Sequence, residues 1–461
     1  MRPTRWRPST HLIVGAAVLA IVAVLLATAA VFTAKHREAR DADIPPPPAV
    51  TANPGVVPVP DTAAMPTPAG LTAMLAPALA DRNLGLLAGR VTDAMTATEL
   101  WQQQDGAPML PASTNKTLTS AAALLALDRD ARITTRVVAG DAPGVVVLVG
   151  GGDPTLSGAR PGQQTWYHGA ARISDLADQV RHSGVAPAAV HVDTSAFSGP
   201  LLAPGWDPGD IEGGDVAPIE SVMLDAGRIQ PATVESTRSH TPALDAGRAL
   251  ALALGVDPSR VTIAPHPAPT GARQLAAVQS APLIQRLQQM MDASDNVMAE
   301  CIGREVAADL GRPRSFAGAV DAVINRLSTA HIDVTGAALQ DSSGLSVDDR
   351  LTAKSLDAVV QAAAGPDQPA LRPLLDMLPI AGGSGTLSDR FLDPTFKPGP
   401  AAGWLRAKTG SLTAINALAG VVTDVSGRVL TFALISNDAG PTGRIAVDNL
   451  AAALRSCGCA T

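Results

Sequence analysis

Three short motifs, spread along a chain of 461 residues, place the strongest constraint on its fold. They read S-x-x-K at residues 113–116, S-D-N at 294–296 and K-T-G at 408–410. Only five lysines occur in the chain, and two of them lie in these motifs. Each motif alone arises readily by chance in a chain of this length. Their order and the rarity of lysine indicate that the fold brings the three segments to one site.

The first motif predicts a nucleophile and its base. Ser113 and Lys116 are three positions apart, so in a helix their side chains lie on one face and touch. A serine hydroxyl is a poor nucleophile until a base removes its proton. Lysine is such a base only when burial or a neighbouring cation lowers its pKa, and Lys408 is the candidate cation. Taken alone, the motif is more often an ordinary helical turn with a solvated lysine.

The second motif falls in a break within a helical pattern that runs over residues 282–310. On such a loop Ser294 and Asn296 can both point into one cleft. The Ser294 hydroxyl is placed to relay a proton between Lys116 and a leaving amine. The Asn296 amide suits both a carbonyl of the substrate and the lysine. Taken alone, this motif is an ordinary polar loop between helices.

The third motif precedes an apolar stretch and predicts an edge strand beside the cleft. The Lys408 charge and the Thr409 hydroxyl suit a carboxylate of the substrate. Gly410 permits a close approach of substrate to the strand backbone. The N–H groups of Ser113 and Ser411 are the expected oxyanion hole for a tetrahedral intermediate. Taken alone, the motif is a plain strand start.

The order of the three motifs is that of the penicillin-binding proteins and class A β-lactamases. Their surroundings resemble one family in this group, the D-alanyl-D-alanine carboxypeptidases of peptidase family S13, of the penicillin-binding protein 4 type. The resemblance covers about residue 75 to the end. It is carried by the segments at 111–116, 148–156, 192–197, 294–300, 378–387 and 407–412.

The resemblance implies an α+β fold with a three-layer α/β/α penicillin-binding transpeptidase-like (β-lactamase-like) domain and an inserted smaller domain. Because 181 residues separate Ser113 from Ser294, we expect a single insertion. The D,D-peptidase domain is expected to comprise residues 71–144 and 276–461, and the inserted domain residues 145–275. The local patterns agree with this class, because the sequence predicts several helical segments together with an antiparallel hairpin at residues 417–436.

The resemblance also implies a reaction. Ser113 would attack a peptidoglycan stem peptide, release the terminal D-alanine and form an acyl-enzyme that water hydrolyses. β-Lactams would be covalent inhibitors, and neither a cofactor nor a metal is expected. A D,D-endopeptidase that cuts cross-links with the same site is the alternative. A β-lactamase needs a deacylating base that no spacing supplies, since Glu300 is expected to point along its helix. The remaining alternative is a non-catalytic wall-binding protein. The intact motif residues argue against it, because such a protein would be free to lose them.

Two positions bear on substrate choice. Residues 341–347 depart from the family's D-G-S-G-L-S-R, because Val347 replaces an arginine that would help to bind the substrate's side chain. Arg350 is the candidate substitute. Asp193 aligns with a family acid that pairs with the free amine of a diamino acid, although an aspartate at a strand end is as often a turn former.

The N-terminal region has the pattern of an export or anchor segment. Residues 12–34 carry no charge, and three arginines precede them. This predicts a cytoplasmic tail and a transmembrane anchor within residues 1–34, with the catalytic body extracytoplasmic on the cell membrane. A signal peptide cleaved near residues 27–29 is the alternative and would give a secreted protein. Residues 35–70 are rich in proline and are expected to form a linker.

The rest of the chain is acidic. After residue 40 it holds 29 basic and 41 acidic residues, which argues against nucleic acid as a partner because phosphate binding needs clustered Lys and Arg. The three cysteines are Cys301, Cys457 and Cys459. An exported protein can oxidise them, and their pairing stays open.

Overall fold

The computed structural model describes residues 62–234, 236–392 and 401–458. The predicted tail and anchor at residues 1–34 lie outside these ranges, as does most of the predicted linker. Among the described residues, no helix combines the length and apolar character needed to cross a membrane.

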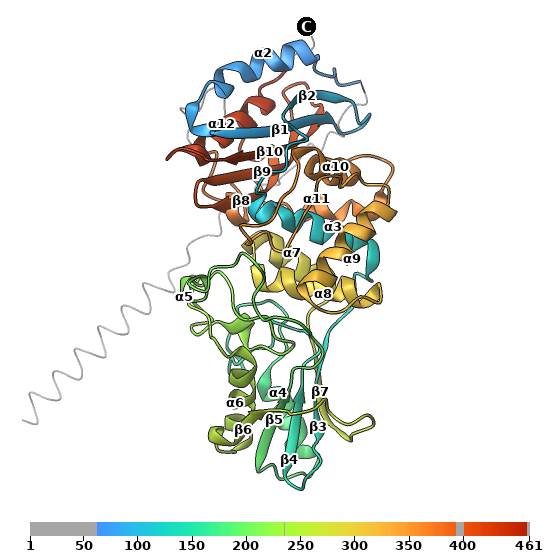
Figure 1. Cartoon of the computed structure of the whole chain (residues 1–461), viewed down its shortest axis with the longest axis vertical. Coiled ribbons are helices and arrows are strands. Elements are labelled where there is room, and N and C mark those ends of the chain that lie inside the picture. The colour runs from blue at the N-terminus through green and yellow to red at the C-terminus, as the bar shows by residue number, and fades with distance from the viewer. Residues whose placement is uncertain (1–61, 235, 393–400, 459–461) are drawn as a thin grey trace, which may run out of the picture. The chain divides into compact units, whose positions relative to one another are not determined.

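The first of two sheets joins the two ends of the described chain. It has five antiparallel strands in the order β2-β1-β10-β9-β8, and β8 lies at one edge (Figure 1). In register, Leu86 at the start of β1 faces Asn437 at the end of β10. The strands are β1 Leu86–Asp93, β2 Glu99–Gln103, β8 Leu405–Leu412, β9 Ile415–Thr423 and β10 Val429–Asn437.

Helices cover both faces of this sheet. Burial is continuous along the interior of β10, and because successive side chains point to opposite faces, both faces must be covered. In β10, Phe432 and Leu434 contribute to a core shared with α2 (Pro68–Leu79) and α12 (Gly443–Arg455). Ala433 and Ile435, between and after them, belong to a second core on the opposite face. That core is completed by α3 Lys116–Ala126, α7 Leu283–Ala293, α8 Asn296–Asp309, α9 Phe316–Thr329, α10 Ala353–Ala364 and α11 Pro373–Met377.

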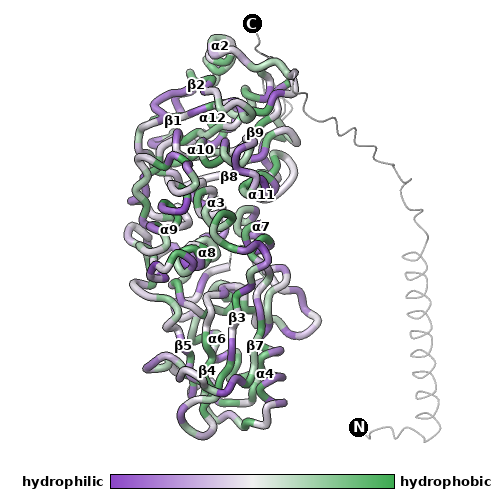
Figure 2. Tube along the Cα trace, turned by 90° about the vertical axis from the view of Figure 1, so that its right-hand side faces the viewer, coloured by the Kyte–Doolittle hydropathy of each residue, from purple (hydrophilic) through white to green (hydrophobic). Residues whose placement is uncertain are grey.

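The resulting α/β/α arrangement confirms the predicted fold class. In Figure 1, α2 and α12 lie on one side of the sheet, and α3, α10 and α11 lie on the other. The predicted hairpin at residues 417–436 is present as β9 and β10. Figure 2 shows hydrophobic residues, in green, along elements of both sheets, with hydrophilic residues interspersed.

A second sheet has a core of its own. Its order is β6-β5-β4-β3-β7, with parallel pairing among β4, β5 and β6 and antiparallel pairing of β3 with β4 and β7. Leu148, Val190 and Val192 pack with aliphatic residues of the two helices beside it. The elements are β3 Thr134–Ala139, β4 Val145–Val149, β5 Ala189–Asp193, β6 Val261–Ile263, β7 Gln274–Gln279, α4 Ile173–His182 and α6 Pro242–Leu254.

This sheet lies between the first and second motifs in the sequence. The range 145–275 contains β4, β5 and β6, whereas β3 precedes it and β7 ends just after it. The domain boundaries stay a prediction. Of the cysteines, Cys301 is a buried free thiol in α8, and Cys457 is disulfide-bonded.

Candidate active site

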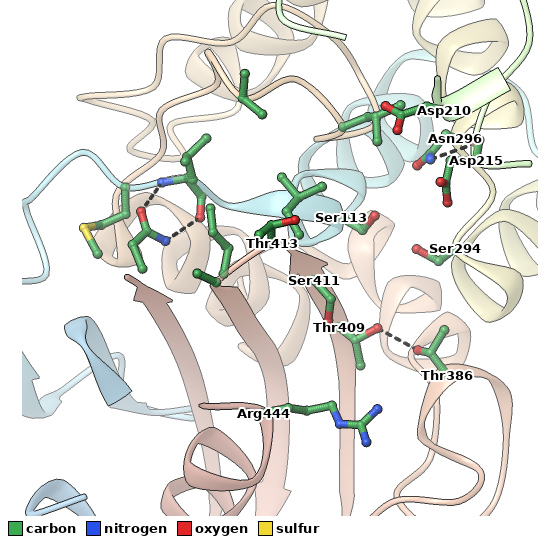
Figure 3. Close-up of a pocket in the computed structure, with 18 of the residues that line it drawn as sticks. Ser113, Asp210, Asp215, Ser294, Asn296, Thr386, Thr409, Ser411, Thr413 and Arg444 are labelled. Atoms are coloured by element: carbon green, nitrogen blue, oxygen red, sulfur yellow. Dashed lines mark hydrogen bonds between the residues drawn. The ribbon is translucent and has the colours of Figure 1, made fainter. Parts of the chain in front are cut away.

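A cavity of about 1310 Å³ opens where the first sheet meets the loop that precedes α6. Residues from all three motifs line it (Figure 3). These are Ser113, Ser294, Asn296 and Thr409, and Ser411 directly after the third motif also lines the cavity. The fold therefore brings together side chains that lie far apart in the sequence.

Ser113 lies in a short 3-10 turn that leads directly into α3. The turn comprises Ala112–Asn115, and Lys116 is the first residue of the helix. Lys116 Nζ lies 2.9 Å from Ser113 Oγ. The three-residue spacing thus gives the contact that it predicted, although through a 3-10 turn rather than the start of a regular α-helix.

Lys116 is fully buried, and its amine has two further neighbours. It donates to Asn296 Oδ1 at 2.6 Å and to the Ser343 carbonyl at 2.8 Å. Burial lowers the pKa of Lys116 to about 8, while buried carboxylates, of which Asp341 acts most strongly, oppose the shift. About a tenth of the amine is therefore neutral at pH 7, far more than for an ordinary lysine, and only this neutral form can act as a general base.

The second motif turns the chain between two helices. Helix α7 ends at Ala293, and Ser294 takes a left-handed conformation with φ of 58°. Asp295 then caps α8 by accepting a hydrogen bond from the Met298 N–H at 2.9 Å. This sharp turn presents Ser294 and Asn296 to the same cavity, which a continuous helix cannot do.

The third motif lies on the edge strand β8, as predicted. Lys408 is fully buried and donates to Ser294 Oγ at 2.9 Å and to the Thr409 carbonyl at 2.9 Å. Its pKa lies well below the usual value, first because it is buried and then because of the nearby charges of Lys116 and Arg390. The two lysines contact different serines, so Ser294 links Lys408 to the cavity that holds Ser113.

The other residues of the third motif face the cavity or its wall. Thr409 Oγ1 donates to Thr386 Oγ1 at 2.8 Å. The Ala407 N–H leaves the sheet to reach the Pro379 carbonyl, so strand alternation also turns the Thr409 and Ser411 N–H groups away from β9. The Ser411 N–H is therefore available to the cavity.

Gly410 is also needed for packing, and its predicted role in the approach of substrate stays a prediction. A Cβ atom at this position would lie 2.6 Å from the Pro111 carbonyl oxygen and 3.1 Å from Ala112 Cβ. The glycine lets the strand pack directly on the turn that carries Ser113. Its absence of a side chain thus sets the distance between two motifs.

The family model for D-Ala-D-Ala carboxypeptidase 3 (S13) matches residues 71–237 and 232–454. The chain belongs to this family. A further model, for the N-terminal domain of carboxypeptidases like Rv3627c, matches residues 1–58.

Relatives and solved structures agree with the S13 assignment. The chain is 70% identical to carboxypeptidase Rv3627c of Mycobacterium tuberculosis and 67% identical to carboxypeptidase DacB of Mycolicibacterium smegmatis, each over 100% of both chains. It resembles the crystal structure of penicillin-binding protein 4 from Haemophilus influenzae, with a TM-score of 0.67 and 22% identity over 84% of this chain and 98% of that one. That likeness shows a shared fold.

Asp193, the predicted partner of a substrate amine, is not among the residues that line the cavity with the three motifs. It ends β5 in the second sheet, where its carboxylate accepts hydrogen bonds from the N–H groups of Ser195 at 2.9 Å and Ala268 at 2.7 Å. It is also one of the residues that line a separate cavity of about 570 Å³. The bond to Ser195, two residues on, is that of a turn former, whereas the bond to Ala268 ties the end of β5 to a segment distant in the sequence. The pairing with an amine stays a prediction.

Val347 and its candidate substitute, Arg350, differ in whether they line the cavity. Val347 is exposed and lines the catalytic cavity. The guanidinium of Arg350 instead donates to the backbone carbonyls of Val347 at 3.0 Å and Asp349 at 2.7 Å. Arg350 is absent from the described cavity lining.

Charged residues that the sequence did not single out lie at the cavity wall (Figure 3). Asp210 begins the short helix α5 (Asp210–Gly213), Asp215 follows that helix, and burial raises the pKa of both carboxyls. Arg444 comes from the first turn of α12, and Arg390 from a loop before β8. None belongs to a spaced motif, and the only available signal was the acidic, glycine-rich run at residues 207–215.

Proposed function

We propose that this member of the S13 family is a serine D,D-carboxypeptidase that removes the terminal D-alanine from peptidoglycan stem peptides. The observation that carries the proposal is the 2.9 Å contact between Ser113 Oγ and the fully buried Lys116 Nζ. The S13 family assignment supplies the substrate class.

The first half of the reaction forms an acyl-enzyme. The neutral Lys116 amine takes the Ser113 proton as Oγ attacks the carbonyl of the penultimate D-alanine. The N–H groups of Ser113 and Ser411 stabilise the oxyanion. The tetrahedral intermediate then collapses, the peptide C–N bond breaks, and the leaving nitrogen gains the proton that Lys116 took from Ser113. Ser294 is placed to pass that proton along, since its hydroxyl contacts the Lys408 amine.

The second half restores the enzyme. Water attacks the ester carbonyl while the neutral Lys116 amine takes one of its protons, the Ser113–acyl bond breaks, and Lys116 returns that proton to Ser113 Oγ. The shortened peptide leaves with a new carboxylate. A β-lactam enters the same first step, because its ring amide opens onto Ser113, and we propose that it thereby inhibits the enzyme.

A D,D-endopeptidase activity is the second candidate. The cavity extends past Ser411 along the strand end to Asn437, Asp438 and Arg444, beyond what one D-alanine needs. A cross-linked substrate places a second peptide on this leaving-group side. The same acyl-enzyme serves both reactions.

Labelling with a fluorescent penicillin tests the acyl-enzyme. We expect a stable adduct on the full chain and none on Ser113→Ala, because the hydroxyl is the attacking group. An adduct that survives in Ser113→Ala would assign the nucleophile elsewhere, and rapid turnover of the drug would indicate a β-lactamase. Release of D-alanine from a pentapeptide, compared with cleavage of a cross-linked dimer, separates the two peptidase activities.

We further propose that residues 1–34 anchor the enzyme in the cell membrane, with the catalytic body outside. The uncharged stretch at residues 12–34 and the arginines before it support this. Fractionation of cells should recover the full chain with membranes. Recovery of a shortened chain in the medium would favour the cleaved signal peptide.

A further inference from the structure

Three acceptors surround the Lys116 amine, and a neutral amine can donate to only two of them. The three are Ser113 Oγ at 2.9 Å, Asn296 Oδ1 at 2.6 Å and the Ser343 carbonyl at 2.8 Å. A neutral amine has two N–H groups and one lone pair. To act as a base, it must direct its lone pair at Ser113. Asn296 and Ser343 must therefore take both N–H groups.

The Asn296 acceptor has an evident support. Its Nδ2 group donates to the Asp215 carbonyl at 3.0 Å, which fixes the amide with Oδ1 toward Lys116. The Ser343 carbonyl needs a comparable support, because it belongs to a segment outside the helices and strands, residues 341–346.

Asp341 organises this segment from within. Its Oδ1 accepts from the N–H groups of Ser343 at 3.0 Å and Gly344 at 2.6 Å. Its Oδ2 accepts from Ser346 N–H at 2.8 Å and from Trp206 Nε1 at 2.7 Å. One carboxylate thus closes a tight loop around the Ser343 peptide.

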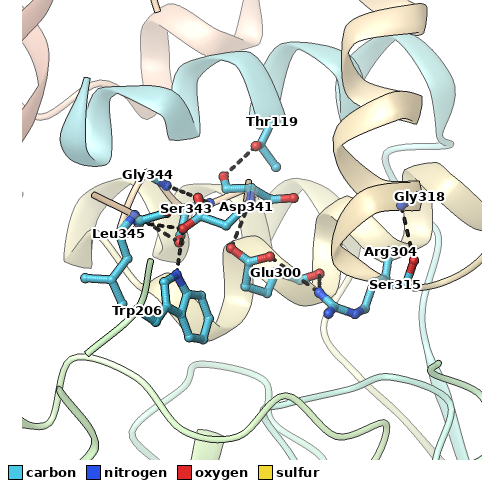
Figure 4. A network of polar contacts seen from close by, with 12 residues as sticks. Thr119, Trp206, Glu300, Arg304, Ser315, Gly318, Asp341, Ser343, Gly344 and Leu345 are labelled. Carbon is cyan, nitrogen blue, oxygen red and sulfur yellow. Dashed lines mark hydrogen bonds and ion pairs between the residues drawn. The ribbon is translucent and has the colours of Figure 1, made fainter. Parts of the chain in front are cut away.

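Glu300 holds the same segment from α8 (Figure 4). It is fully buried, and its Oε1 accepts from the Ser342 N–H at 2.9 Å. On the other side of that residue, Thr119 Oγ1 donates to the Ser342 carbonyl at 2.6 Å. Arg304, one turn along α8, lies 3.4 Å from Glu300 Oε2. Ser342, the residue before Ser343, is therefore hydrogen-bonded to both α3 and α8.

The segment also packs against the turn that bears the nucleophile. Gly344 has φ of 81°, and a Cβ atom there would lie 1.9 Å from the Ala112 carbonyl oxygen. A shift of residues 341–346 therefore displaces the environment of both Ser113 and Lys116.

We propose that Glu300 is a positioning residue for Lys116. It holds residues 341–346 so that the Ser343 carbonyl takes one N–H of the neutral amine and the lone pair is left for the Ser113 hydroxyl. This rests on the proposed function, in which Lys116 is the base. Glu300 acts through the segment, and its carboxylate contacts Ser342 rather than the reacting atoms.

Glu300 also contributes charge. Burial raises the pKa of Glu300 to about 7, so its carboxylate is mostly ionised in the range where Lys116 loses its proton. A nearby negative charge favours the ammonium form, so removing it lowers the pKa of Lys116 further. Several charged groups interact with Lys116. They are Asp295 at the N-cap of α8, Glu300 in α8, Asp341 and Asp349 from the neighbouring segment, Asp215 from the loop before α6, and Lys408 from β8.

Glu300→Gln in the full chain tests the proposal through the pH profile of acylation by a fluorescent penicillin. We expect the high-pH plateau rate to fall roughly threefold to tenfold, as for one weakened hydrogen bond. We also expect the acid limb to move to lower pH, with the affinity for the unreacted drug unchanged. Thr119→Val changes no charge, so it should lower the plateau rate without moving the acid limb of the pH profile. This variant carries the test if Glu300→Gln fails to fold.

Asp357→Asn is the matched control, because Asp357 is a fully buried carboxyl that bonds to Thr92 on β1 instead. It should leave plateau and limb in place. Wild-type values for both Glu300→Gln and Thr119→Val would overturn the positioning role alone, as would equal changes in Asp357→Asn. A wild-type chain that forms no adduct would overturn the proposed function together with this inference.

Discussion

The two sheets have the same number of strands but differ in what they bury. Around the first sheet, Lys116 and Lys408 are both fully buried, and Glu300 lies buried behind them. The core of the second sheet is aliphatic, with Leu148, Val190 and Leu250 among its fully buried residues. A buried charge costs several kcal/mol unless it is well partnered. The two buried motif lysines mark the first sheet as the half that carries the candidate site.

The second half reaches the cavity chiefly through a loop. Trp206, Asp210 and Asp215 lie on the chain between β5 and α6 and line the cavity wall. The strands themselves stay away, and Asp193 at the end of β5 faces a different cavity. The second sheet thus supports a loop that forms part of the cavity wall, but its strands supply no residue to the described cavity lining. Mutations in its core should therefore change stability and leave the reaction rate unchanged.

The largest expected effect is on chemistry in the first half. Lys116→Met should lower the rate of penicillin adduct formation by roughly 10²- to 10⁴-fold, because the base is lost while the buried volume is kept. Stopped-flow or gel-based labelling measures this rate. Lys354→Met is the control, since Lys354 is exposed and paired with Asp333 at 3.0 Å. A rate within a few-fold of wild type in Lys116→Met would show that another group is the base.

The next effect separates stability from chemistry. Leu148→Ala in the second core and Leu434→Ala beside the first sheet should each cost about 2–5 kcal/mol in the free energy of unfolding, because both leave cavities in buried cores. Urea titration measures the loss. We expect folded Leu148→Ala to acylate at the wild-type rate per active site. A slower rate would show that the second sheet is coupled to the reacting groups.

Local patterns predicted elements of the first half well. The hairpin of β9 and β10 and the break at Ser294 both follow from short-range chemistry. By contrast, β3 was not predicted. It pairs with β7, so that Thr134 faces Gln279, and no nearby residue signals a partner so distant in the sequence.

The candidate site divides in the same way. Ser113, Lys116 and Ser294 belong to motifs whose spacing reflects contacts within one turn of chain, and the structure places all three at the cavity or directly behind it. Asp210 and Arg444 reach the cavity only because separate elements fold against each other. The role of Glu300 could not be predicted for the same reason, because a helical pattern in the sequence cannot show that residues 341–346 lie against that helix.

The pH dependence should follow the buried base in the first half. With the pKa of Lys116 near 8, the neutral fraction and hence the acylation rate should rise roughly tenfold from pH 7 to pH 9. The sign follows from the role, because only the deprotonated amine accepts the Ser113 proton. Rates of labelling across this range measure it, with Leu148→Ala expected to give the same curve. A flat profile would mean that Lys116 enters the reaction already neutral or is not the base.

The smallest expected effect concerns the loop by which the second half reaches the site. Asp210→Asn should raise KM about threefold for a stem peptide with a free side-chain amine, which is the size of a partly exposed ion pair. Acetylating that amine should remove the difference between the two proteins. Asp193→Asn is the matched variant, because its carboxylate lies at the other cavity and holds a turn. If Asp193→Asn raised KM for the free amine and Asp210→Asn did not, the amine would be bound by the second sheet itself, and the division between the halves would fail.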